Sequence, residues 1–142
     1  MACHNGHAAV VSVLLDRARD SIDVNKAETR GITPLWMACY KGHSEVVSFL
    51  LDKARDTINV NQATIDHGCT PLWMACQSGN VKVVSVLLDK AHHTIDVNQA
   101  STTNGRTPLF MACEQGQCRV VKLLLQLDAD ANRADDRGEY DM

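Results

Sequence analysis

One heptapeptide constrains the fold of this 142-residue chain more than any other feature. The string TPLWMAC occupies residues 33–39 and returns unchanged at 70–76, and TPLFMAC follows at 107–113, so each copy starts 37 residues after the one before. Similarity at a fixed period of this length is typical of solenoids, in which copies of one small unit stack on each other. Catalytic sites are seldom made by repeating a segment three times, so we interpret the string as framework.

The remainder of the unit repeats at the same phase. Behind the first heptapeptide come Gly42, a Val-Val pair at 46–47, a Leu-Leu pair at 50–51 and Val-Asn at 60–61, and the other units carry the same series with few changes. Residues 1–3 align with the end of a heptapeptide, so the first unit lacks its front half. We therefore divide the chain into a partial unit 1–28, units of about 29–65, 66–102 and 103–135, and a terminal stub 136–142.

Each unit carries the signals of two helices and a turn. Thr33 is a good N-cap and Pro34 suits the first helical position, so a short first helix is predicted up to Gly42, whose left-handed conformation would end it. A second helix is predicted over residues 44–54, because its Val and Leu pairs form one apolar stripe. Asn, Asp and Gly then predict a protruding hairpin-like turn over residues 58–68. A unit this short must bury its apolar faces against its neighbours.

These motifs resemble the ankyrin repeat, whose consensus has T-P-L-H-x-A within about 33 residues. The resemblance extends from residue 1 to about residue 138, and it implies an all-α solenoid of stacked helix-turn-helix units linked by hairpin-like loops. In the family, the His of T-P-L-H bridges adjacent hairpins by hydrogen bonds. Here Trp36, Trp73 and Phe110 replace it, and we expect a column of stacked aromatic rings in its place.

The unit also departs from the family in length. Leu51 and Asn61 are ten positions apart, whereas Leu125 and Asn132, at the same phases of the last unit, are seven apart. Three added residues make nearly one helical turn, so the second helix, or the loop after it, should be longer in the first three units. The hairpins before Gly68 and Gly105 also contain one residue more than those before Gly31 and Gly138.

Composition and charge exclude several classes of function. Apolar content of 45% and charged content of 22% are typical of a globular chain rather than a disordered one. A net charge of −3 gives no basic field for nucleic acid, and no apolar run is long enough to span a membrane. We expect neither a nucleic-acid nor a membrane partner. Four of the six cysteines follow the repeat, which favours free thiols and an intracellular location, cytoplasmic or nuclear.

The cysteines themselves offer little chemistry. Cys39, Cys76 and Cys113 should lie one unit apart, on the order of 10 Å, whereas a disulfide needs Cα atoms within about 7 Å. We interpret them as buried small hydrophobes. We expect Cys69 to be exposed in its hairpin and Cys118 to begin a second helix.

Other catalytic and metal-binding patterns are absent from the sequence. Cys3, His4 and His7 lie close together, but neither they nor the His92-His93 pair have the spacing of a zinc site. No phosphate loop, nucleophile elbow or pair of catalytic carboxylates is present. We therefore expect no metal, no cofactor and no enzyme activity. The acids that recur near the ends of the second helices fit a solvated outer face: Asp16, Asp52 and Asp89.

A binding surface is implied by the resemblance to ankyrin repeats, which present hairpin tips and the exposed side of the first helix on a concave face. At these positions the units differ, although the framework repeats almost letter for letter. Unit-specific residues suit recognition of an irregular partner, and they equally fit a surface under no constraint. The candidate residues are Thr29, Arg30, Ile32, Tyr40, Lys41, Asp66, His67, Cys69, Gln77, Ser78, Thr103, Asn104, Arg106, Glu114 and Gln115.

We hypothesise that the chain is a non-catalytic module that binds a partner protein. Tyr40 is the best candidate anchor, because Tyr is enriched among interface hot spots. We expect Tyr40→Ala and Arg106→Ala to weaken binding with little effect on the melting temperature. The alternative is a regulatory or targeting segment of a larger multidomain enzyme or receptor. Uncapped ends should also allow end-to-end self-association.

Overall fold

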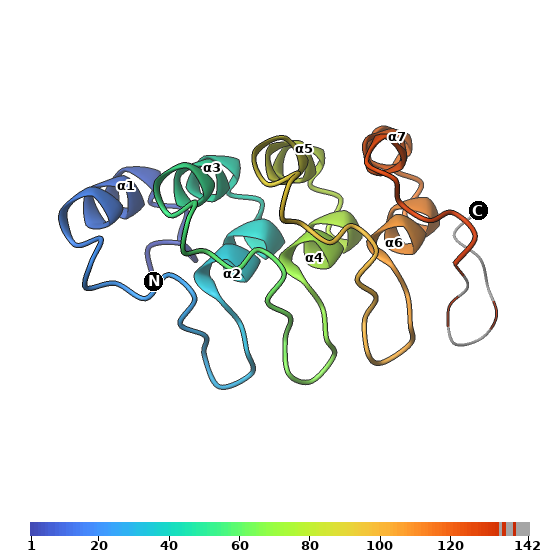
Figure 1. Ribbon diagram of the computed structural model, residues 1–142, viewed down its shortest axis with the longest axis horizontal. Helices are drawn as coiled ribbons and strands as arrows, with labels where there is room; N and C mark the ends of the chain where they lie inside the picture. Colours follow the sequence, from blue (N-terminus) through green and yellow to red (C-terminus); the bar gives the residue numbers. More distant parts are fainter. Residues whose placement is uncertain (134, 136–137, 139–142) are drawn as a thin grey trace.

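Seven helices form two parallel rows in the computed structural model, which describes residues 1–133, 135 and 138 (Figure 1). One row holds the second helices of the four units, and the other holds the first helices of the three full units; the hairpin loops project beyond the first helices. Most of the predicted terminal stub, 136–142, lies outside the described residues. The helices are α1 (Ala8–Arg17), α2 (Pro34–Lys41), α3 (Ser44–Lys53), α4 (Pro71–Gln77), α5 (Val81–Lys90), α6 (Pro108–Glu114) and α7 (Cys118–Gln126).

Each first helix begins and ends as the sequence predicts. The Thr33 hydroxyl oxygen accepts a hydrogen bond from the backbone N–H of Trp36 at 3.1 Å, and Pro34 occupies the first helical position. Thr70 and Thr107 cap α4 and α6 in the same way. Gly42 has φ 79°, in the left-handed region that favours glycine, and it ends α2.

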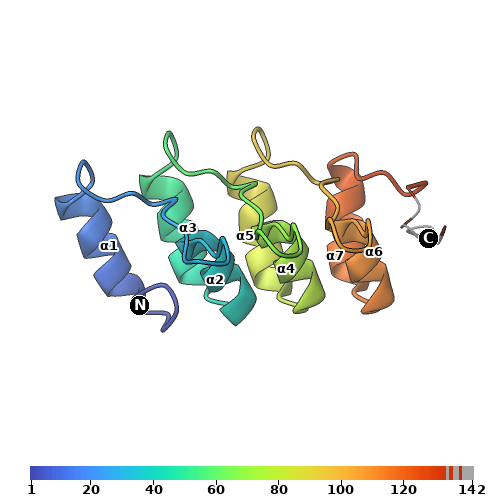
Figure 2. The ribbon, with the colours of Figure 1, turned by 90° about the horizontal axis from the view of Figure 1, so that it is seen from below.

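The second helices supply the continuous apolar core. In α3, Val46, Val47, Leu50 and Leu51 are all buried, and the equivalent residues of α5 are buried as well. Successive second helices pack side by side along one row, and so do successive first helices along the other (Figure 2). The core therefore runs along the whole stack, and each full unit completes it only together with its neighbours.

The hairpins are joined to one another through their backbones. Within a hairpin, the Thr64 N–H donates to the Cys69 carbonyl at 3.1 Å. Between hairpins, the Ile65 N–H donates to the Arg30 carbonyl at 3.0 Å. Gly68 lies so close to the next hairpin that a Cβ atom there would come within 2.5 Å of the Thr102 side chain. The close spacing of the loops therefore depends on glycine at this position.

The two tryptophans of the heptapeptides bridge neighbouring units by hydrogen bonds, and the expected column of stacked aromatic rings is wrong. The Trp36 Nε1–H donates to the Cys69 carbonyl at 3.0 Å, and the Trp73 Nε1–H donates to the Arg106 carbonyl at 2.8 Å. Of these two indoles, only Trp36 has a ring partner in the described part of the chain, and that partner is Tyr40. Rings one unit apart are about 10 Å from each other, beyond the range of ring pairing. The indole N–H instead reaches the next hairpin.

The three added residues of the early units lie mainly in the loop after the second helix. The helices α3 and α5 each have 10 residues and α7 has 9, so the helix itself differs by one residue. After α3, the Thr57 and Ile58 N–H groups both donate to the Ala54 carbonyl and form an additional turn. After α7, Asp128 adopts a positive φ of 62° and the chain leaves the helix at once.

Polar side chains at fixed phases also cross from unit to unit. Asn80 donates to the Cys39 carbonyl at 3.0 Å, and Gln117 donates to the Cys76 carbonyl at 2.8 Å. Asn61 donates to the Thr94 carbonyl at 2.8 Å, as Asn25 does to that of Thr57 at 2.7 Å. These bonds reach backbone carbonyls near the end of a first helix or in the turn after a second helix, and they fix the register between units.

Replacing Trp73 by Phe tests the bridging role of the indole. The unit accepts Phe at this phase, since Phe110 occupies it, but the variant leaves the Arg106 carbonyl without the N–H of Trp73. We expect the free energy of unfolding to fall by about 1–2 kcal/mol. Urea denaturation followed by circular dichroism measures this, with the exposed Tyr40→Phe as a control that changes stability by less than about 0.5 kcal/mol. A Trp73→Phe variant as stable as the parent would contradict the assignment.

Candidate protein-binding surface

Most of the candidate residues lie exposed on the hairpins or near the ends of the first helices. We call this region, formed by the hairpins and the first helices, the hairpin surface; Figures 1 and 2 show both element types on one side of the second helices. Ile32, Asn104 and Arg106 are half-buried, and Cys69 is buried. The exposed candidates are Thr29, Arg30, Tyr40, Lys41, Asp66, His67, Gln77, Ser78, Thr103, Glu114 and Gln115.

Tyr40 presents an apolar ring that its neighbours hold in place. Its side chain emerges near the end of α2, and the residue is 46% exposed. Its ring centroid lies 5.6 Å from that of Trp36, and the Lys41 Nζ lies 5.3 Å from the Tyr40 ring centroid. A ring that is restrained before binding loses little conformational entropy when a partner covers it.

Ile65 is an exposed apolar residue that the sequence analysis missed. It lies in the hairpin of the second full unit, is 72% exposed, and its N–H bonds to the Arg30 carbonyl of the preceding hairpin. The positions carried over from the family flank the hairpin glycine and leave this one out. The available signal was an isoleucine within TIDHG, a segment otherwise made of turn-forming and polar residues.

Adjacent hairpins are also linked through polar side chains. The Arg30 Nε lies 2.9 Å from a carboxylate oxygen of Asp66, and both side chains are exposed. The His67 Nδ1 lies 3.0 Å from the Thr103 hydroxyl in the next hairpin. These contacts bring candidate residues of successive units together. Exposed pairs of this kind contribute little to stability, so they remain available for a partner.

Cys69 belongs to the framework, and the expectation that it is exposed is wrong. The residue packs into the apolar core, and its carbonyl accepts the indole N–H of Trp36. Burial raises the pKa of its thiol to about 11, so it is a poor nucleophile at neutral pH. Burial also raises the pKa values of Cys39 and Cys76, which are packing residues as expected. Cys118 begins α7 and is exposed, also as expected.

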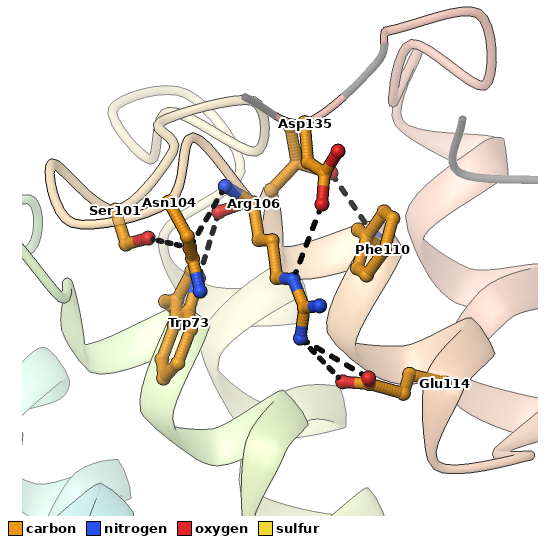
Figure 3. A network of polar contacts seen from close by, with 8 residues as sticks. Trp73, Ser101, Asn104, Arg106, Phe110, Glu114 and Asp135 are labelled. Atoms are coloured by element: carbon orange, nitrogen blue, oxygen red, sulfur yellow. Dashed lines mark hydrogen bonds and ion pairs between the residues drawn. The ribbon is translucent and has the colours of Figure 1, made fainter. Parts of the chain in front are cut away.

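Arg106 is held in a network of ion pairs (Figure 3). Its guanidinium lies 3.1 Å from both carboxylate oxygens of Glu114 and 3.4 Å from the buried carboxylate of Asp135, and it lies 4.7 Å from the Phe110 ring centroid. The Arg106 side chain is only 14% exposed, and its backbone carbonyl accepts the Trp73 indole N–H. The expectation that Arg106 lies outside the framework is therefore wrong, because this side chain joins the last two hairpin segments.

The described residues show few features of a catalytic or metal site. Residues 1–133, 135 and 138 contain no group of three or more His, Cys, Asp or Glu side chains that could hold a metal ion. An apolar groove of about 300 Å³ lies beside α1, where the first unit lacks the front half of its first helix; Leu14, Ile32 and Met37 are among the residues that line it. Within the part of the chain that the structure covers, every helix is too short or too polar to cross a membrane.

Comparison with known families agrees with this architecture. A family model described as ankyrin repeats (3 copies) matches residues 1–64 and 55–135. The chain belongs to the ankyrin-repeat family. No curated protein matches the chain. The family match and the seven helices confirm the all-α solenoid predicted from the sequence. Ankyrin repeats are in general non-catalytic modules of protein–protein interaction.

Two arginines that neighbour hairpin glycines, Arg30 before Gly31 and Arg106 after Gly105, allow a comparison of an exposed ion pair with a buried one. Arg106→Ala takes a cation away from the buried Asp135 carboxylate, and we expect a loss of about 2–3 kcal/mol in the free energy of unfolding. Arg30→Ala removes only an exposed pair and should change stability by less than about 0.5 kcal/mol. Thermal and urea denaturation of both variants measure the difference. Equal stability of the two variants would show that the network around Arg106 contributes nothing.

Proposed function

We propose that this ankyrin-repeat chain binds a partner protein through its hairpin surface. The observation that carries the proposal is the contrast between the two parts of the unit: the framework repeats almost letter for letter, whereas the exposed hairpin surface differs in every unit. The exposed pairs are Tyr40-Lys41 in the first full unit, Gln77-Ser78 in the second and Glu114-Gln115 in the third.

Two exposed apolar residues from successive units supply the candidate anchors. Tyr40 near the end of α2 has the exposed Lys41 beside it, and Ile65 in the next hairpin is followed by the exposed Asp66 and His67. Interfaces commonly place an apolar anchor inside a polar rim, and the anchor carries most of the binding energy. We therefore expect the partner to present an apolar pocket or side chain to the first two full units.

The alternative is that the chain regulates or targets a larger enzyme or receptor, with the activity encoded elsewhere. The same hairpin surface would then bind another domain of that larger protein. In either case this chain itself is non-catalytic, in keeping with the family. All six cysteines are free, which supports a reducing intracellular location, cytoplasmic or nuclear.

Self-association through the two ends of the stack is a second candidate function. It is favoured by apolar side chains that are exposed at the ends of the stack and buried at the equivalent positions inside it. Val10 and Leu14 are exposed on α1, and Leu125 is exposed on α7.

The anchor role of Tyr40 and Ile65 can be tested by comparative affinity capture. We expect Tyr40→Ala and Ile65→Ser each to reduce recovery of the specific partner from native cells at least tenfold, which corresponds to about 1.4 kcal/mol. The melting temperature should change by less than a few degrees, because Tyr40 is 46% exposed and Ile65 is 72% exposed.

The control is Arg55→Ala, an exposed residue in the turn after α3, away from the hairpins. Quantitative mass spectrometry of the captured proteins compares the three variants with the parent chain. Unchanged recovery with both anchor variants, or equal loss with Arg55→Ala, would rule out the hairpin surface as the binding site.

A further inference from the structure

Each second helix has two apolar sides that face different neighbours. The side that we call leading carries the phases of Val46 and Leu50, and the trailing side carries those of Val47 and Leu51. On α1, the first helix in the structure, the trailing residues Val11 and Leu15 are buried against α3, whereas the leading residues are exposed. The leading side therefore packs on the unit before, and the trailing side packs on the unit after.

The two ends of the stack expose opposite sides of this interface. Leu14, on the leading side of α1, is 44% exposed, while its equivalent Leu50 is 2% exposed. Leu125, on the trailing side of α7, is 45% exposed, while its equivalent Leu51 is 4% exposed. One end of the stack thus exposes the leading side of a second helix, and the other end exposes the trailing side.

We infer that two copies of this chain associate head to tail, with the trailing side of α7 of one copy packed on the leading side of α1 of the next. This contact would repeat the α1–α3 and α3–α5 interfaces that the chain already forms. It rests on the second candidate function and specifies its partner and geometry. Because the two surfaces differ, the contact is heterologous and each added copy leaves one free surface of each kind.

The charges across the internal interfaces are compatible with this contact. Lys53 forms an ion pair with Asp16 of the preceding unit, and Lys90 forms one with Asp52 at 2.6 Å. Arg17 of α1 occupies the phase of Lys53, and Gln126 of α7 occupies the phase of Asp52. Arg17 would therefore face a neutral Gln126, so the junction lacks the ion pair but brings no like charges together.

A polar side chain at the start of the second helix provides a further match. His43 Nε2 lies 3.0 Å from the His4 carbonyl of the preceding unit, and Asn80 and Gln117 bond to the preceding unit from the same phase. In the first unit this phase is held by His7, which is exposed at the start of α1. In the head-to-tail contact, His7 would take the place that His43 has inside the stack.

Analytical ultracentrifugation of complementary variants tests the geometry. Leu125→Glu removes the trailing surface and Leu14→Glu removes the leading surface, so each variant alone should stay monomeric at concentrations where the parent chain forms a series of oligomers. An equimolar mixture should form a 1:1 dimer and nothing larger, because only one good pair of surfaces remains. Circular dichroism of each variant, and its unfolding in urea, verify that the fold is intact.

Whereas the two glutamate variants should abolish association, Gln126→Asp should strengthen it. An acidic residue opposite Arg17 should reproduce the Asp52–Lys90 pair and strengthen association several-fold at low salt, with the gain lost in high salt, whereas Gln126→Lys should weaken it.

The outcomes distinguish self-association of the chain from the head-to-tail geometry of that association. A parent chain that stays monomeric up to millimolar concentration overturns self-association itself and the head-to-tail contact with it. A parent chain that associates while Leu125→Glu still forms dimers supports self-association but overturns the head-to-tail geometry, because it indicates a symmetric contact between two α1 helices. None of these results affects binding through the hairpin surface.

Discussion

The burial of one apolar stripe between successive second helices is the interaction on which the rest of the structure depends. A unit of about 37 residues has too little apolar surface to form a core alone, so Val47 and Leu51 of one unit must meet Val83 and Leu87 of the next. This requirement explains why these letters repeat with so little change. Within the part of the chain that the structure describes, it also explains why Leu14 of α1 and Leu125 of α7 are exposed on the outermost second helices while Leu50 and Leu51 are buried between units.

Hydrogen bonds between units turn this stacking into a fixed register. The indole of Trp36 reaches the next hairpin, and Asn80 reaches back to the preceding first helix. Apolar packing is non-directional, whereas these bonds have defined partners and geometry. Neighbouring hairpins are consequently joined, as by the bond from the Ile65 N–H to the Arg30 carbonyl.

The sequence predicted what is local or periodic and failed where distant residues decide. Thr33, Pro34 and Gly42 mark helix ends through their own backbone chemistry, so they could be interpreted one unit at a time. Periodicity showed that Trp36 and Trp73 are equivalent, but the unit spacing determines whether their rings meet. Arg106 follows a hairpin glycine as Cys69 does, and neither looks buried from its neighbours in sequence. Their environments depend on Asp135, which is 29 positions further along the chain, and on Trp36, which is 33 positions before Cys69.

The most direct test of the stacking requirement is the helicity of a single unit. Circular dichroism of an isolated peptide of residues 66–102, which contains one full first helix, one full second helix and their loops, compares it with the intact chain under the same conditions. If units are stable only against their neighbours, the peptide should show little helix and no cooperative melting. A helical peptide with a sigmoidal thermal transition of its own would contradict the account.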